Sequence, residues 1–184
     1  MKRSLIATLS TVVISQAAAG VLSARAADVP TAILSDDGMT VSYTPCAEDE
    51  ATECIVYALD CRSDTGYGDN LRITVMGNTE QGPDVRAIAK RLLDSSYGEM
   101  TVRFAFAGRE PLDLMLTAFA VNQNEMDGDW ILDLHSYQQD MLLAALDESS
   151  VRSVTLQVAD HSMVLSDNAK AAERLLRFRN ACTN

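Results

Sequence analysis

Two histidines stand directly before serines, and an aspartate precedes each pair within two residues. The segments are Asp133-Leu134-His135-Ser136 and Asp160-His161-Ser162. A serine nucleophile needs a base to accept its proton, and the base needs an acidic group to orient it. The residue types are therefore those of a hydrolase that would use His135 or His161 as its base.

Adjacency in the sequence does not itself favour catalysis. Neighbouring residues of a strand point to opposite faces, so His161 is badly placed to serve Ser162, and the chain has no Gly-x-Ser-x-Gly nucleophile turn. A simpler interpretation is that Ser136 and Gln139 open a helix as a capping box and that His161 sits in an exposed turn. We therefore assign no catalytic residue, no cofactor and no metal ligand from the sequence, and we favour a non-enzymatic protein.

The chain has four cysteines, Cys46, Cys54, Cys61 and Cys182. An even number of cysteines in an exported chain predicts two disulfides, and their spacing lacks the close C-x-x-C pair of most structural zinc sites. If residues 54–61 form a strand, its two cysteines are about 23 Å apart, which is too far for a disulfide. Cys54 and Cys61 must then pair with other partners.

Hydrophobic periodicity favours one of the remaining pairings. Cys61 shares a strand face with Tyr57 and Leu59, and Cys182 continues a helical stripe with Leu175 and Phe178. We therefore predict Cys61–Cys182 as a disulfide within the core, and Cys46–Cys54 as a second one that closes a short loop. A disulfide between Cys54 and Cys182 is the competing arrangement.

The loop between Cys46 and Cys54 is strongly acidic, with Glu48, Asp49, Glu50 and Glu53. The whole chain of 184 residues has 15 Lys plus Arg against 26 Asp plus Glu, a net charge of -11. This balance excludes nucleic acid as a partner, because phosphate binding needs a basic surface. The acids either keep the loop solvated or make first contact with a cationic partner, as in an inhibitor of a cationic cell-wall-degrading enzyme such as lysozyme.

A second polar loop, from Ser63 to Asn70, contains Asp64 and Asp69. These oxygen-bearing side chains suit a hard cation, and they equally suit a solvated surface turn. Both interpretations stay open at the level of the sequence.

The N-terminus has the layout of a secretory signal peptide. Lys2 and Arg3 precede an apolar stretch from Leu5 to Ala19, and small residues lead to Ala26. We expect cleavage after residue 26, with a cut after Ala19 as the alternative because Ala17-Ala18-Ala19 also offers small residues. The expected product is soluble, does not span the membrane, and is periplasmic or secreted. Removal of residues 1–26 takes away three basic residues and no acid, so the exported part is more acidic than the whole chain.

Residues 27–184 are predicted to form a single α+β domain with a mainly antiparallel sheet and about three helices, because most connections between strands have hairpin length. The expected helices cover residues 83–95, 136–147 and 167–182. Asp167 is expected to cap the last helix, and Tyr137, Met141, Leu142, Ala145 and Leu146 are expected to form the core face of the second. The expected strands are 31–35, 39–44, 54–60, 71–76, 100–106, 112–121, 130–135, 154–158 and 162–166.

The last segment, Ser162-Met163-Val164-Leu165-Ser166 followed by Ala169, Ala172, Leu175, Leu176 and Cys182, resembles the closing strand and helix of the invasion-associated locus B family. Members of this family are small exported envelope proteins with cysteines. The resemblance covers residues 162–182. It implies a non-enzymatic envelope role, with contact to host cells as one form of it, and it assigns no catalytic residue.

The function expected from the sequence is thus that of an exported protein that binds a protein or an envelope component. This hypothesis rests on the signal peptide, the predicted disulfides and the acidic surface.

Overall fold

The computed structural model describes residues 31–45, 55–61, 71–77, 83–94, 98–123 and 130–183. Several predicted features lie outside these residues: the signal segment 1–26, Cys46 and Cys54, the acids Glu48, Asp49, Glu50 and Glu53, and the loop from Ser63 to Asn70.

The described strands form one sheet in which every pairing is antiparallel. Its order is β1-β2-β3-β4-β7-β6-β5-β8-β9. This confirms the predicted mainly antiparallel sheet. More of the described residues lie in strands than in helices. The strands are β1 (Thr31–Leu34), β2 (Thr40–Thr44), β3 (Tyr57–Asp60), β4 (Leu71–Met76), β5 (Glu99–Phe106), β6 (Leu112–Gln123), β7 (Trp130–Ser136), β8 (Val154–Val158) and β9 (His161–Ser166).

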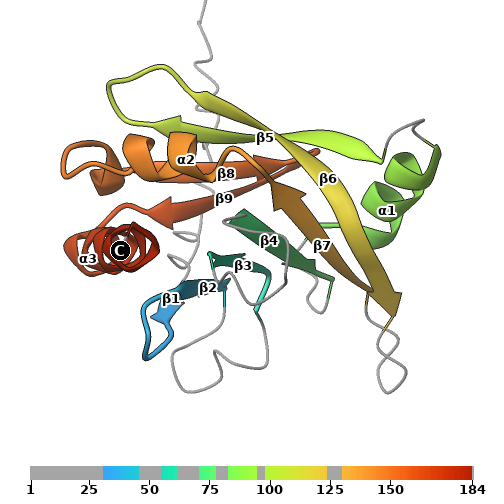
Figure 1. Cartoon of the computed structure of the whole chain (residues 1–184), viewed down its shortest axis with the longest axis horizontal. Coiled ribbons are helices and arrows are strands. Elements are labelled where there is room, and N and C mark those ends of the chain that lie inside the picture. Colours follow the sequence, from blue (N-terminus) through green and yellow to red (C-terminus); the bar gives the residue numbers. More distant parts are fainter. Residues whose placement is uncertain are drawn as a thin grey trace, which may run out of the picture.

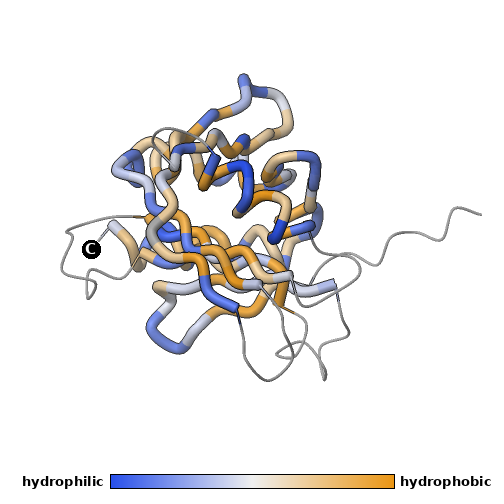
Figure 2. Tube along the Cα trace, turned by 90° about the vertical axis from the view of Figure 1, so that its right-hand side faces the viewer, coloured by the Kyte–Doolittle hydropathy of each residue, from blue (hydrophilic) through white to orange (hydrophobic). Residues whose placement is uncertain are grey.

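The sheet curves so that its two halves face each other across the core. Figure 1 shows β1, β2 and β3 on the lower side of the molecule and β5, β8 and β9 on the upper side. In β5, Val102, Phe104 and Phe106 are buried while the residues between them are exposed, so one face of the strand points inward. Figure 2 shows hydrophobic stretches running through the middle of the fold and hydrophilic ones at several of its outer bends.

Three α-helices accompany the sheet in the described part of the chain: α1 (Val85–Asp94), α2 (Gln139–Ala145) and α3 (Ala169–Cys182), with a short 3₁₀ helix, η2 (Ser150–Arg152), after α2. The first helix buries Val85, Ile88, Ala89 and Leu92, the face that its periodicity predicts. None of these helices is long and apolar enough to cross a bilayer.

The C-terminal helix closes the fold. It contacts β1, β2 and β9, and therefore bridges the two ends of the sheet (Figure 1). Cys182 at its end forms a disulfide with Cys61, which directly follows β3, with the two Cα atoms 5.8 Å apart. The predicted Cys61–Cys182 pairing is thus confirmed. The disulfide joins residues 121 positions apart in the sequence.

Two predicted helix caps are wrong. The second helix begins after Gln138, with no side-chain cap, and Ser136 instead accepts a hydrogen bond from the Gln138 backbone N–H. The third helix is capped by Asn168, whose side chain accepts from the Ala171 N–H, and not by Asp167. Both helices begin later than the pattern indicates: Asn168 before α3 is still extended, whereas Gln138 before α2 has φ -102° and ψ 28°, which is neither helical nor extended.

The predicted core face of α2 is also partly wrong. Leu142, Ala145 and Leu146 are buried, but Met141 is half exposed and Tyr137 is 79% exposed. Tyr137 lies before the helix begins, so the helical period that linked it to Met141 does not apply there.

Candidate functional site

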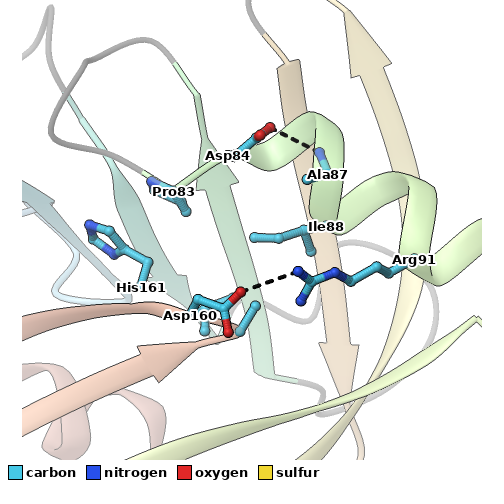
Figure 3. A pocket seen from close by; sticks show the side chains of 9 residues that line it. Pro83, Asp84, Ala87, Ile88, Arg91, Asp160 and His161 are labelled. Atoms are coloured by element: carbon cyan, nitrogen blue, oxygen red, sulfur yellow. Dashed lines mark hydrogen bonds and ion pairs between the residues drawn. The ribbon is translucent and has the colours of Figure 1, made fainter.

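A cavity of about 300 Å³ lies between the start of α1 and the turn that joins β8 to β9. Figure 3 shows its lining side chains, with those of α1 on one side and those of the turn on the other. It combines an apolar wall with charged and polar groups, which is the usual composition of a small binding pocket. The lining residues are Pro83, Asp84, Ala87, Ile88, Arg91, Val158, Ala159, Asp160 and His161.

The helical wall is positioned by an N-terminal cap. The carboxylate of Asp84 accepts a hydrogen bond of 2.9 Å from the backbone N–H of Ala87 (Figure 3). This satisfies one of the free N–H groups of the first helical turn. The buried Ile88 anchors the same turn to the core, so that Arg91, one turn further on, projects at the cavity rim.

The opposite wall is a two-residue turn with an uncommon backbone. Val158 and His161 are paired across the turn, and Ala159 between them has a φ of 52°. A residue other than glycine in this left-handed region costs about 1 kcal/mol or more, and such positions gather at functional sites. The conformation places Asp160 and His161 at the cavity.

His161 is fixed by a contact from the other half of the sheet. The hydroxyl oxygen of Tyr57 lies 2.7 Å from Nδ1 of His161. Burial raises the pKa of Tyr57 far above its usual value, so the phenol keeps its proton and can donate it in this hydrogen bond. In that arrangement Nδ1 of His161 is the acceptor. His161 is thus not in an exposed turn, as the sequence predicted, but is the half-buried first residue of β9.

The rim carries charges of both signs. Nη2 of Arg91 lies 3.2 Å from Oδ2 of Asp160, and their side chains are 65% and 88% exposed (Figure 3). An ion pair so exposed to water contributes little to stability. It can therefore open at low cost when a ligand offers each group a new partner.

A smaller cavity of about 210 Å³ adjoins the first. The two share Ile88, Arg91 and Ala159, and the smaller one extends toward Glu99 and Met100 at the start of β5. Arg91 therefore stands where the two meet.

The structure does not bring the two predicted histidine sites together. His135 is on β7, opposite Arg72 of β4, and it alternates with the buried Leu134, so it points away from the core face. The side chain of His135 is nevertheless buried, with only 8% of its surface exposed. This burial, and secondly the positive charge of Arg72, lower the pKa of His135. Ser136 serves the adjacent backbone, as described above.

Ser162, the nucleophile that the sequence offers to His161, is exposed and points to the other face of β9. The described residues contain no group of three or more histidine, cysteine, aspartate or glutamate side chains suited to a metal ion. The predicted partner contacts Glu48, Asp49, Glu50 and Glu53 lie outside the described part of the chain.

Two residues of this site were missed in the sequence. Tyr57 was placed only on the strand face of Cys61, and Arg91 lies within the expected helix 83–95, to which no binding role was assigned. The one local sequence signal for this site was the pair Asp160-His161 in a short turn. Tyr57 and Arg91 reach this turn only through the curvature of the sheet, which no local pattern indicates.

Comparisons of the chain with protein-family models, with curated proteins and with solved structures found no match.

Proposed function

We propose that the protein is an exported, non-enzymatic α+β domain that binds a protein or envelope component, and that the cavity beside His161 is its binding site. The observation that carries this proposal is the cavity itself, with an exposed ion pair of Arg91 and Asp160 at its rim. A peptide-like component has both an ammonium or guanidinium and a carboxylate group. Such a ligand would exchange one weak ion pair for two.

Binding is favoured over hydrolysis by the state of His161. Its Nδ1 is engaged by Tyr57, whose raised pKa makes it a proton donor and not an anionic orienter. The orienting acid of a hydrolase histidine would have to occupy that position. With Ser162 on the opposite face, the hydrolase hypothesis for His161 has the weaker support.

The location follows from the sequence alone and stays part of the proposal. The signal segment 1–26 would direct the chain to the periplasm or the medium, where the Cys61–Cys182 disulfide can persist. The narrower alternative, inhibition of a cationic enzyme such as lysozyme through the acids of residues 48–53, is tested by inhibition that weakens with salt.

The binding site can be tested by crosslinking in the native envelope. A photoreactive amino acid at Ala87, which lines the cavity, should capture a peptide-containing component. The same group at Leu93, which is 76% exposed and outside the lining, is the matched control on the same helix. Capture from position 87 should disappear in Arg91→Glu and stay in Arg86→Glu, which reverses an exposed charge on α1 outside the cavity.

Identical products from positions 87 and 93, or capture that survives Arg91→Glu, would refute the cavity as the site. Conversion of the captured component by the purified protein would instead favour an enzyme. Circular dichroism melting curves of each variant establish that the fold is retained.

A further inference from the structure

A second and larger cavity, of about 580 Å³, lies on another part of the molecule, between η2 and the first half of α3. It shares no residue with the cavity beside His161. We call it the α3 groove. Its lining residues are Glu148, Val151, Arg152, Asp167, Asn168, Ala169, Ala172, Glu173 and Leu176.

The floor of the α3 groove is apolar. Val151 and Ala172 belong to the buried core, and Leu176 is partly buried and packs against it. Ala169, Ala172 and Leu176 recur at steps of three and four, so they form one stripe along the helix. This stripe faces the cavity and leaves room for apolar side chains of another molecule.

The rim of the groove is acidic. Glu148, Asp167 and Glu173 are all exposed, and Arg152 is the one basic residue in the lining. The N-terminus of α3 adds about half a positive elementary charge. Within the lining, three carboxylates outweigh these two contributions, so the lining residues carry a net negative charge on a chain whose net charge is -11.

Both walls are held in place by hydrogen bonds. Next to Glu148, the carboxylate of Asp147 accepts bonds from the N–H and hydroxyl of Ser149 and from the N–H of Ser150, at 2.6 to 2.9 Å. On the other wall, Asn168 caps α3 through the Ala171 N–H. Little conformational entropy would be lost on binding, because the groove is already formed.

We propose that the α3 groove binds a cationic amphipathic peptide segment, with its apolar side chains on the Ala169–Leu176 stripe and its lysine or arginine side chains at Glu148, Asp167 and Glu173. An amphipathic helix laid in an apolar groove is a common mode of peptide recognition. Charge complementarity selects the cationic member of this class and steers it to the surface. The groove does not depend on the binding proposed for the cavity beside His161.

The experiment measures fluorescence anisotropy of a short labelled peptide of leucine and lysine at helical spacing, with the oxidised full chain at low salt. A leucine and glutamate peptide of the same pattern and a lysine and serine peptide without an apolar face are the comparison ligands. Only the leucine and lysine peptide should bind tightly, and added salt should weaken it.

Variants locate the binding. Glu148→Lys/Glu173→Lys should weaken it by about tenfold or more, whereas Asp94→Lys/Glu110→Lys, with the same change in net charge at exposed positions outside the groove, should leave it within about twofold. Arg152→Glu, which removes the basic residue of the rim, should strengthen binding, a gain that loss of folding cannot produce.

Three results would overturn the proposal. They are equal weakening by both double variants, no gain in Arg152→Glu, or loss of binding when Glu48, Glu50 and Glu53 are changed to glutamine, which would place the peptide on the acidic loop. Failure here leaves the crosslinking outcome at Ala87 unaffected, so the two proposals are judged separately.

Discussion

The hydroxyl of Tyr57 on β3 is hydrogen-bonded to Nδ1 of His161 on β9, over a distance of 2.7 Å and 104 positions of sequence. β3 is the third strand from one end of the sheet and β9 is the last strand at the other. The bond therefore connects the two halves of the curved sheet directly at a part-buried position, and it orients the histidine of the candidate cavity.

Removal of this bond should destabilise the protein measurably. Tyr57→Phe leaves Nδ1 of His161 without its phenol donor, and we expect the free energy of unfolding to fall by about 1 kcal/mol in urea titrations. Tyr43→Phe is the matched control, since Tyr43 is paired with Tyr57 across β2 and β3 but its buried hydroxyl has no hydrogen-bond partner among the described residues. That variant should be neutral or more stable, and equal losses in both would contradict the assigned role of Tyr57.

The Cys61–Cys182 disulfide should make the largest single contribution to the free energy of unfolding. It closes a loop across 121 positions, for which the chain-entropy model gives about 5 kcal/mol. Cys61→Ala/Cys182→Ala should lower the urea midpoint strongly with little change in the native circular dichroism spectrum. A Cys46→Ala/Cys54→Ala variant separates this effect from the other two cysteines, and a peptide map with Cys54 joined to Cys182 would contradict the observed pairing.

The turn that carries Glu148 should respond to acid through Asp147. Hydrogen bonds from the Ser149 hydroxyl, and then from the Ser150 N–H, lower the pKa of Asp147 to about 2. The unfolded chain binds the proton more readily, so the stabilisation is present above the ordinary pKa of 3.8 and is lost as pH falls toward about 2.

Asp147→Asn keeps an acceptor oxygen without the charge. The difference in unfolding free energy between the native chain and this variant should therefore shrink as pH is lowered through that window, as measured by denaturant titration at each pH. A constant difference over the same range would show that the charge of Asp147 is not involved.

Two glycines distinguish backbone conformation from packing. Gly38 and Gly108 have nearly equal positive φ values, 76° and 75°. A methyl group on Gly38 would lie 3.1 Å from Cβ of Ala181 in α3, whereas one on Gly108 would meet nothing within 4 Å. We expect Gly108→Ala to cost about 1 kcal/mol and Gly38→Ala about 2 kcal/mol in thermal or urea unfolding. Equal costs would mean that α3 can move away from the β1–β2 turn.

Local patterns predicted the elements well and their ends less well. The strand at Leu71–Met76 follows from an apolar period of two residues, and the buried face of α1 from a period of 3.6 residues. Both periods can be recognised within a short stretch of sequence. The caps of α2 and α3 depend on the backbone dihedral angles of single residues. The patterns do not encode those angles, so Asp167 was chosen where Asn168 caps α3.

Long-range arrangement was predictable only where two buried patterns had to meet. Cys61 and Cys182 each lay on an apolar face, and the fold joins them. By contrast, the pairing of β4 with β7 and the approach of Tyr57 to His161 arise from the order and curvature of the sheet. Local hydrophobic periodicity predicts neither the strand pairing nor the contact between Tyr57 and His161.

The helix α3 lies against both end strands of the sheet. It contacts both outermost strands, β1 and β9, and Arg174 donates a hydrogen bond to the backbone carbonyl of Ala32 in β1. Outer strands with free backbone groups are templates for aggregation. Because the disulfide holds the end of α3, we expect a reduced chain whose last helix detaches to lose its cover at both end strands and to aggregate more readily than the oxidised chain.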